Sequence, residues 1–182
     1  LGVSRIVLAR EANLDVIKEI KEKVDIDIEV FAHGALCMSY SGQCLFSSLA
    51  AKKSGNRGEC LQLCRLPYSF YVNDNKIDTN GDYHLSLKDL STLSYLDKFI
   101  ELGVTSLKIE GRVKSASYVG QVISTYRKYI DEYYKNGQYE VDNKDVYNLK
   151  KVFNREFTKG YLFNEYNKDI VIIIKYIILL TY

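Results

Sequence analysis

Four cysteines lie close together in the chain, and their thiols are the side chains best suited to bind a metal. The chain contains no other cysteine, and the four form the pattern C-x6-C-x15-C-x3-C at Cys37, Cys44, Cys60 and Cys64. The packing of a domain gives no reason to gather every thiol into one short stretch. Because a deprotonated thiol is a strong metal ligand, the set predicts a site for an inorganic group.

The spacing of these thiols is compatible with more than one state. Disulfide bonds form in oxidising compartments, and no secretory signal peptide is visible, so we expect a reducing, cytoplasmic location. Structural zinc sites usually contain two close pairs; Cys60 and Cys64 suit one, but Cys37 and Cys44 are too widely spaced for the other. An iron–sulfur cluster tolerates wider spacing because its ligands surround a larger object. Spacing alone leaves zinc, a cluster and unligated thiols open.

The cysteines belong to a segment, 34–67, that is polar and rich in Gly and Ser. A structureless loop of this length is uncommon in a compact domain unless something organises it. Small residues let backbone N–H groups approach sulfur, which tunes a metal centre. The segment also has more bases than acids, namely Lys52, Lys53, Arg57 and Arg65 against Glu59. These bases indicate either a solvent-exposed loop or contacts with phosphates.

Three side chains outside this segment are candidates for positioning a substrate. His33 stands where we expect a strand to end, directly before the cysteines, although a single histidine is as often structural. Glu110 and Arg112 follow another expected strand, where Glu110 could equally belong to a structural ion pair. Arg112 and Lys114 also precede the expected start of a helix. Two cations beside a helix N-terminus suit a phosphate or a small carboxylate-bearing metabolite.

The spacing of apolar residues predicts alternating strands and helices. Strands are expected at 3–9, 26–32, 69–72 and 104–109, and helices at 14–24, 86–102, 115–136 and 146–153. Ser115 is expected to be the N-cap of the longest helix, which ends near Gly137. This order is typical of an α/β protein with parallel strands.

Composition sets limits on the partners of the chain. Lys and Arg number 25 against 23 Asp and Glu, so overall charge argues neither for nor against nucleic acid. The apolar tail at 168–182 is interrupted by Lys175 and is too short to cross a bilayer as a helix, so no membrane span is expected. The peptidase motifs H-E-x-x-H and G-x-S-x-G are absent, and residue patterns therefore give no support for a protease.

Three blocks of the sequence resemble peptidase family U32, the collagenase-like proteases. They are EVFAHGALCMSYSGQCLFSS at 29–48, NRGECLQLCRLPY at 56–68 and LKIEGRVKSASYVGQVISTYRKYID at 107–131. The blocks occur in the order of the family, and the resemblance covers roughly residues 3 to 163. Three ordered blocks are far more specific than an isolated C-x6-C pair.

The resemblance implies a TIM-barrel-like domain, of which this chain would supply the C-terminal part. A whole barrel takes about 250 residues, so we expect a truncated barrel whose N-terminal half is missing or supplied by a partner. The expected division is 1–137 for this half-barrel with its cysteine loop, 138–167 for the start of a C-terminal extension and 168–182 for the atypical tail.

The resemblance also implies a cofactor and a reaction. The four cysteines would bind a 4Fe–4S cluster, and the substrate would be RNA, hydroxylated at the wobble uridine of a tRNA or at a base of ribosomal RNA. His33, Glu110 and Arg112 would position that substrate. The alternative activity is that of a collagenase-like peptidase, and a further alternative is an inactive fragment.

Overall fold

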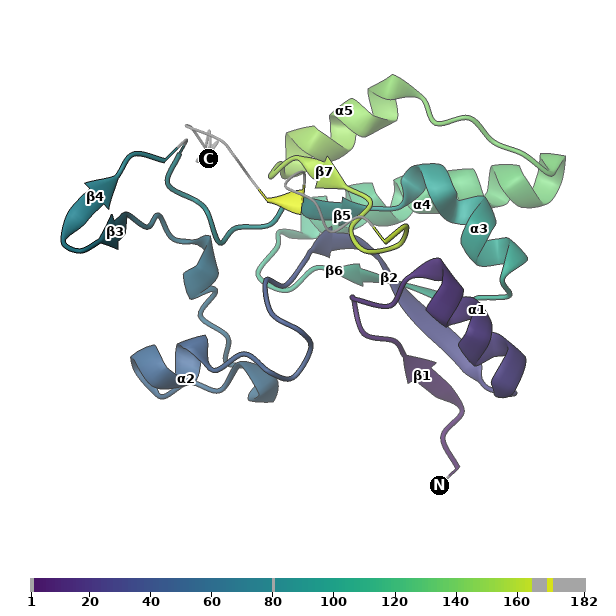
Figure 1. Cartoon of the computed structure of the whole chain (residues 1–182). Helices are drawn as coiled ribbons and strands as arrows, with labels where there is room; N and C mark the ends of the chain where they lie inside the picture. Colours follow the sequence, from purple (N-terminus) through teal and green to yellow (C-terminus); the bar gives the residue numbers. More distant parts are fainter. Residues whose placement is uncertain (1, 80, 165–169, 172–182) are drawn as a thin grey trace. The chain divides into compact units, whose positions relative to one another are not determined.

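The computed structural model describes residues 2–79, 81–164 and 170–171 of the chain (Figure 1). The chain divides into two compact units. The first, here called the sheet unit, consists of residues 1–36 and 89–166, and the second, the cysteine unit, consists of residues 37–88 and 167–182. All four cysteines therefore belong to one unit.

Five strands form one sheet in the sheet unit. They are β1 (Arg5–Val7), β2 (Asp27–Ala35), β5 (Asp89–Ser91), β6 (Ser106–Glu110) and β7 (Phe157–Thr158). The long strand β2 pairs in parallel with β1 and β6 and antiparallel with β5, and β5 pairs in parallel with β7. The α/β prediction is confirmed, with one antiparallel pairing added. Within the described residues this sheet is open and does not close into a barrel.

Four α-helices belong to the described part of the sheet unit, and the longest of them begins and ends where its capping residues predict. They are α1 (Leu14–Lys23), α3 (Leu96–Glu101), α4 (Ala116–Asn136) and α5 (Asn143–Val152). The Ser115 side chain accepts a hydrogen bond from the Tyr118 N–H at the start of α4. Gly137 ends α4 in the left-handed conformation, with φ of 73°. Both predicted ends of α4 are confirmed.

Two apolar clusters hold these helices against the sheet. Tyr118, Val122 and Tyr126 of α4 pack with Ala32 of β2 and Leu149 of α5 in the first. The second joins α1 and α3 to β2, and its buried members are Ile17, Ile28, Val30, Phe99 and Leu162. Burial of these side chains is the main source of stability of the unit. The apolar repeat of α4 also predicts a buried Ile123, and this prediction is wrong, because Ile123 is 51% exposed.

The predicted helix at 86–102 is wrong in its first half. Asp89–Ser91 is strand β5, Leu93–Tyr95 is a 3-10 turn, and only Leu96–Glu101 is α-helical. The leucines recur at helical spacing, but Leu90 instead lies in a sheet between β2 and β7. Pairing with strands distant in sequence has overridden the local pattern.

The cysteine unit contains short elements where a long loop was expected. A single α-helix, α2 (Phe46–Ala51), and two 3-10 turns (Gly55–Arg57 and Leu63–Arg65) lie within the segment. The expected strand at 69–72 is β3 (Phe70–Val72), which forms a hairpin with β4 (Asn75–Ile77). The 34–67 segment is therefore organised by local structure.

The predicted apolar tail at 168–182 lies outside the described residues, except for Ile170 and Val171. The Ile170 carbonyl accepts a hydrogen bond from the Lys88 N–H at 3.0 Å, and Val171 forms a β-bridge with Leu87. In the part of the chain that the structure describes, no helix combines the length and apolar character that a membrane span requires.

Candidate functional site

The four thiols are the chemical centre of the cysteine unit. None is in a disulfide bond; Cys37 is exposed, while Cys44, Cys60 and Cys64 are half-buried. They come from the two sides of α2, two before it in the sequence and two after it. The predicted set is therefore brought onto one small scaffold.

Two side-chain hydrogen bonds tie the segment of Cys44 to the segment of Cys60. The Asn56 side chain donates to the Gly42 carbonyl at 2.7 Å. On α2, Ser47 is 4% exposed, and its hydroxyl accepts a hydrogen bond from the Leu61 N–H at 3.0 Å. Because a buried hydroxyl must find a partner, Ser47 fixes the path of the chain beside Cys60.

A backbone N–H group points at one of the sulfurs. The Gln62 N–H donates to Cys60 Sγ, with 3.4 Å between nitrogen and sulfur. Gln62 itself adopts the left-handed conformation, with φ of 55°. Hydrogen bonds of this kind stabilise thiolates and tune the potential of iron–sulfur clusters.

The four thiols act on one another electrostatically. Burial raises the pKa of the Cys64 thiol above its ordinary value, the Arg65 guanidinium beside it lowers that pKa, and the other three cysteines raise it further. A thiol so placed is a weak nucleophile until a cation lowers its pKa. Among the described residues, no three His, Cys, Asp or Glu side chains form a group that could hold a metal ion. The residue types alone, free thiols with a backbone N–H donor on one sulfur, are those that iron–sulfur clusters use.

His33 lies in the core of the sheet unit. It is 1% exposed, and its Nδ1 is 3.1 Å from the Tyr126 hydroxyl. Strand β2 continues through His33 to Ala35, so the prediction that the strand ends at His33 is wrong; a register shift at this point keeps β2 paired with β6. Burial lowers the pKa of His33 to about 4, the nearby Asp89 carboxylate partly opposes this, and Lys114 adds to it.

The burial of His33 predicts a pH dependence of stability. The pKa of the folded state, about 4, lies below the ordinary value of 6.5, so the unfolded chain binds the proton more readily. His33 therefore stabilises the fold at pH 7, and this stabilisation, roughly 3 kcal/mol, is lost as pH falls from about 6.5 to about 4. Urea unfolding of the wild type and of His33→Gln across this range measures it. An equal pH slope in the two proteins would contradict the assignment.

Glu110 and Arg112 lie together at the end of β6. Glu110 forms an ion pair with Arg10, with 2.5 Å between Oε2 and Nη2, and its Oε1 accepts a hydrogen bond from the Arg112 N–H at 3.1 Å. The Arg112 side chain is exposed. Lys114 lies over the Phe153 ring, with its Nζ 2.7 Å from the ring centroid. The roles predicted for His33, Glu110 and Arg112 toward a substrate stay predictions.

Sequence reasoning missed a buried ion pair next to His33. Arg155 Nη2 lies 2.6 Å from Asp89 Oδ1, and the two side chains are 8% and 2% exposed. The Tyr118 hydroxyl is also buried there and has no hydrogen-bond partner in the described part of the chain; burial raises the pKa of Tyr118. No local pattern in the sequence links Asp89 to Arg155, which lie 66 residues apart.

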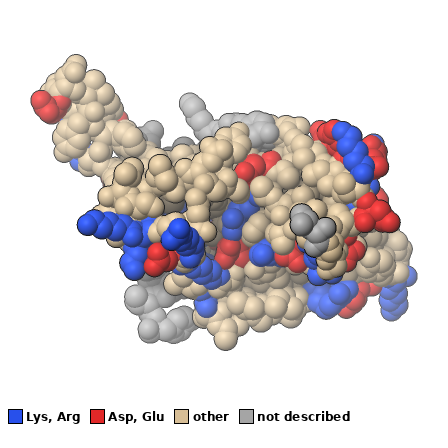
Figure 2. Space-filling view, turned by 90° about the horizontal axis from the view of Figure 1, so that it is seen from below, with Lys and Arg blue, Asp and Glu red and all other residues tan. Residues whose placement is uncertain are grey.

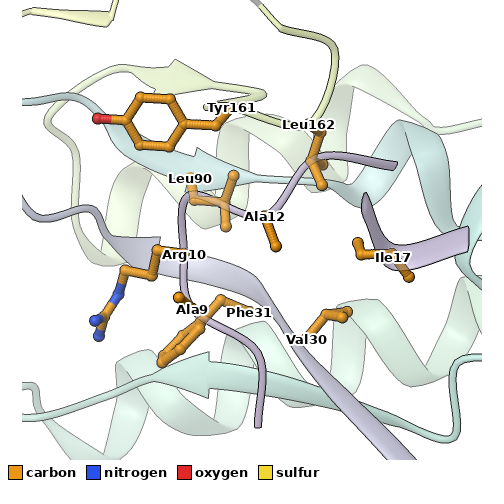
Figure 3. Close-up of a pocket in the computed structure, with 9 residues that line it drawn as sticks. All are labelled: Ala9, Arg10, Ala12, Ile17, Val30, Phe31, Leu90, Tyr161 and Leu162. Carbon is orange, nitrogen blue, oxygen red and sulfur yellow. The ribbon is translucent and has the colours of Figure 1, made fainter. Parts of the chain in front are cut away.

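A small pocket of the sheet unit lies beside β2 (Figure 3). Its empty volume is about 280 Å³ with the open solvent at its mouth included, and it is lined by Ala9, Arg10, Ala12, Ile17, Val30, Phe31, Leu90, Tyr161 and Leu162. In Figure 3 the Arg10 guanidinium points away from Ile17 and Val30. That guanidinium packs on the Phe31 ring, 3.9 Å from its centroid. The lining is therefore mixed, with the polar side chains of Arg10 and Tyr161 beside the apolar ones.

Comparison with known proteins identifies relatives along nearly the whole chain. The chain is 43% identical to the tRNA hydroxylation protein P1 of Bacillus subtilis (strain 168) over 184 residues, which cover 92% of this chain and 44% of that protein. It is 45% identical to the 23S rRNA 5-hydroxycytidine C2501 synthase of Escherichia coli (strain K12) over 131 residues, 72% of this chain and 20% of that protein. It is 39% identical to a Collagenase of Porphyromonas gingivalis (strain ATCC BAA-308 / W83) over 171 residues, which cover 86% of this chain and 41% of that protein.

The chain spans less than half the length of these relatives. No solved structure matches it. The model of peptidase family U32 matches residues 1–171, which include all three blocks on which the resemblance was based. The resemblance is thereby confirmed, and the chain belongs to peptidase family U32.

Proposed function

We propose that this chain supplies the cysteine-bearing part of an enzyme that hydroxylates an RNA base. A 4Fe–4S cluster would be held by Cys37, Cys44, Cys60 and Cys64. The observation that carries the proposal is the gathering of four free thiols on one unit, with the Gln62 N–H directed at sulfur. Two relatives named for hydroxylation of tRNA and for an rRNA 5-hydroxycytidine support it.

The residues of this chain would hold and tune the cluster, which supplies one-electron redox chemistry when bound. Arg112, exposed beside Glu110, would contact a phosphate or a small carboxylate-bearing metabolite. His33 is buried and uncharged at neutral pH, so it would act as a positioning residue through Tyr126. An RNA substrate agrees with a cytoplasmic location.

The sheet unit would be the C-terminal part of a TIM-barrel-like domain. The three parallel strands β1, β2 and β6 support this proposal. The apolar side chains of Val3, which precedes β1, and of Ile6 and Val7 in β1 are 40–56% exposed, as expected of an edge that receives a further strand. The front half of a longer chain, or a partner chain, would supply that strand.

Anaerobic purification should give protein with about four iron and four sulfide per chain and a broad visible absorbance. Cys64→Ser is expected to lose most of the iron and the absorbance, because it removes one of the four ligands. Leu49→Ser, at an 83% exposed position on α2 in the same unit, is the matched control and should keep both. Iron content in Cys64→Ser equal to that of the wild type would rule out the proposed ligand set.

A peptidase is the second candidate, favoured by the 39% identity to a protein named Collagenase. Two assays distinguish the two reactions. Hydroxylation adds one oxygen atom to a nucleoside, and mass spectrometry of digested RNA detects that added mass after treatment with the full-length protein. Gelatin cleavage by wild-type protein stripped of metal would instead support the peptidase, especially if Cys37→Ala lost cleavage while binding metal normally.

A further inference from the structure

An exposed tyrosine stands between the first two cysteines of the cysteine unit. Tyr40 is 66% exposed, and its ring packs against no other ring in the described residues. The backbone beneath it is fixed, because the Tyr40 carbonyl accepts hydrogen bonds from the Gln43 N–H at 3.1 Å and from the Ser39 hydroxyl at 3.2 Å. A flat aromatic ring is thus presented to solvent on a braced turn.

A second turn brings an arginine next to this one. The Asn56 side chain donates to the Gly42 carbonyl at 2.7 Å and so joins the turn of Tyr40 to the turn at Gly55–Arg57. Arg57 is exposed, and in the described part of the chain its side chain makes no hydrogen bond or ion pair. Lys53, by contrast, is paired with Glu59 at 3.3 Å.

The charge of this region differs from that of the chain as a whole. The formal net charge of all 182 residues is only +2. Figure 2 shows Lys and Arg interspersed with Asp and Glu over the face it presents. Between positions 37 and 66, however, four bases stand against the single acid Glu59. The positive excess of the chain is therefore concentrated around the cysteines, where it is complementary to phosphate.

We propose that Tyr40 and Arg57 form the RNA contact of the cysteine unit, an inference that rests on the proposed function. The Tyr40 ring stacks on an unpaired base, and Arg57 binds a neighbouring phosphate. Proteins that read RNA bases act mostly on single-stranded loops, whose unstacked bases lie against aromatic side chains. Because Tyr40 lies between Cys37 and Cys44 in the sequence, the stacked base is held beside the proposed cluster ligands.

Fluorescence anisotropy with the whole chain tests this surface. The probe is a labelled RNA hairpin with an unpaired loop, compared with a fully paired duplex of equal length. Tyr40→Ala should weaken binding to the loop about tenfold, whereas Tyr40→Phe, which keeps the ring, should bind as the wild type does. Arg57→Ala should weaken binding and lower the slope of log K against log salt by about one.

Matched controls separate this surface from general effects. Tyr71→Ala removes a 61% exposed tyrosine from the β3–β4 hairpin, and Lys53→Ala removes a lysine already paired with Glu59; both should bind within about twofold of the wild type. Iron content is measured in every variant. If Tyr40→Ala also loses iron, Arg57→Ala decides the question by its salt slope.

Two outcomes overturn the proposal in different ways. If the wild type binds the hairpin, and Tyr40→Ala and Arg57→Ala bind it equally well, the RNA contact is elsewhere and the proposed function is unaffected. If the iron-loaded wild type binds neither the hairpin nor the duplex, and the full-length protein modifies no RNA, the proposed function fails together with this surface.

Discussion

Replacing Gly34 by alanine is expected to lower the free energy of unfolding by about 3 kcal/mol or more. A Cβ at this position would lie 2.5 Å from the Glu110 carbonyl oxygen and 3.1 Å from the Tyr118 hydroxyl. The first of these atoms is backbone of the paired strand β6 and cannot move without breaking the ladder. Gly34 also has φ of 104°, a conformation that L side chains rarely adopt.

Gly137→Ala is the matched control for this change. Gly137 also has positive φ, 73°, but nothing lies within 4 Å of its added Cβ. Its cost should be about 1 kcal/mol, the conformational contribution alone. Urea unfolding followed by circular dichroism compares the two variants. Equal destabilisation would show that β2 and β6 are not packed as closely at Gly34 as the structure has them.

Arg155→Met is expected to destabilise the sheet unit by about 3–5 kcal/mol. The substitution removes the partner of Asp89, whose side chain is only 2% exposed, and leaves a carboxylate in the core without a compensating charge. The Arg155 guanidinium donates from both Nε and Nη2 to the same carboxylate oxygen, at 3.2 and 2.6 Å. Urea unfolding at pH 7 measures the loss.

Arg127→Met provides the comparison on the surface of α4. Arg127 pairs with Asp131 at 2.7 Å, but the two side chains are 56% and 66% exposed, so its removal should change stability by less than about 0.5 kcal/mol. The double variant Asp89→Leu with Arg155→Met should recover part of the stability lost in Arg155→Met, because no buried charge is then left. A loss in Arg155→Met no larger than in Arg127→Met would contradict the buried pair.

The parts of the fold that local chemistry determines could be predicted from the sequence. Helix α4 follows from its apolar repeat, the Ser115 side chain at its start and Gly137 at its end. These signals act over a few residues and need no tertiary partner. Strands β1 and β6 were located for the same reason, from short apolar runs bounded by polar residues.

The error at 86–102 has a physical cause that the sequence does not display. Asp89 is a poor strand residue by propensity, yet it is buried in β5 because Arg155, distant in the sequence, neutralises it. Leu90 then packs in the sheet and not along a helix. Only the tertiary pairing of β5 with β2 and β7 distinguishes this arrangement from a helical leucine repeat.

The candidate site was predictable in its residue types and not in its geometry. The spacing of the cysteines indicated a shared inorganic group, and all four do lie in one unit. The Gln62 N–H that donates to Cys60 belongs to a residue in the left-handed conformation, which is uncommon for residues other than glycine and asparagine and which the sequence does not reveal. His33 was placed at the end of a strand because Gly34 follows it, whereas that glycine allows two strands to approach closely.

The chain leaves the sheet after Ala35 and returns at Asp89, and these two residues face each other on antiparallel strands. In an ordinary β-hairpin, such a pair is joined by a turn of about two residues. Residues 37–88 therefore occupy the place of a hairpin turn, with both stems anchored in the same ladder. A segment inserted at such a point can change in length or sequence while every strand of the sheet keeps its neighbours. Evolution or engineering can therefore replace residues 37–88 without changing the pairing of β2 with β5.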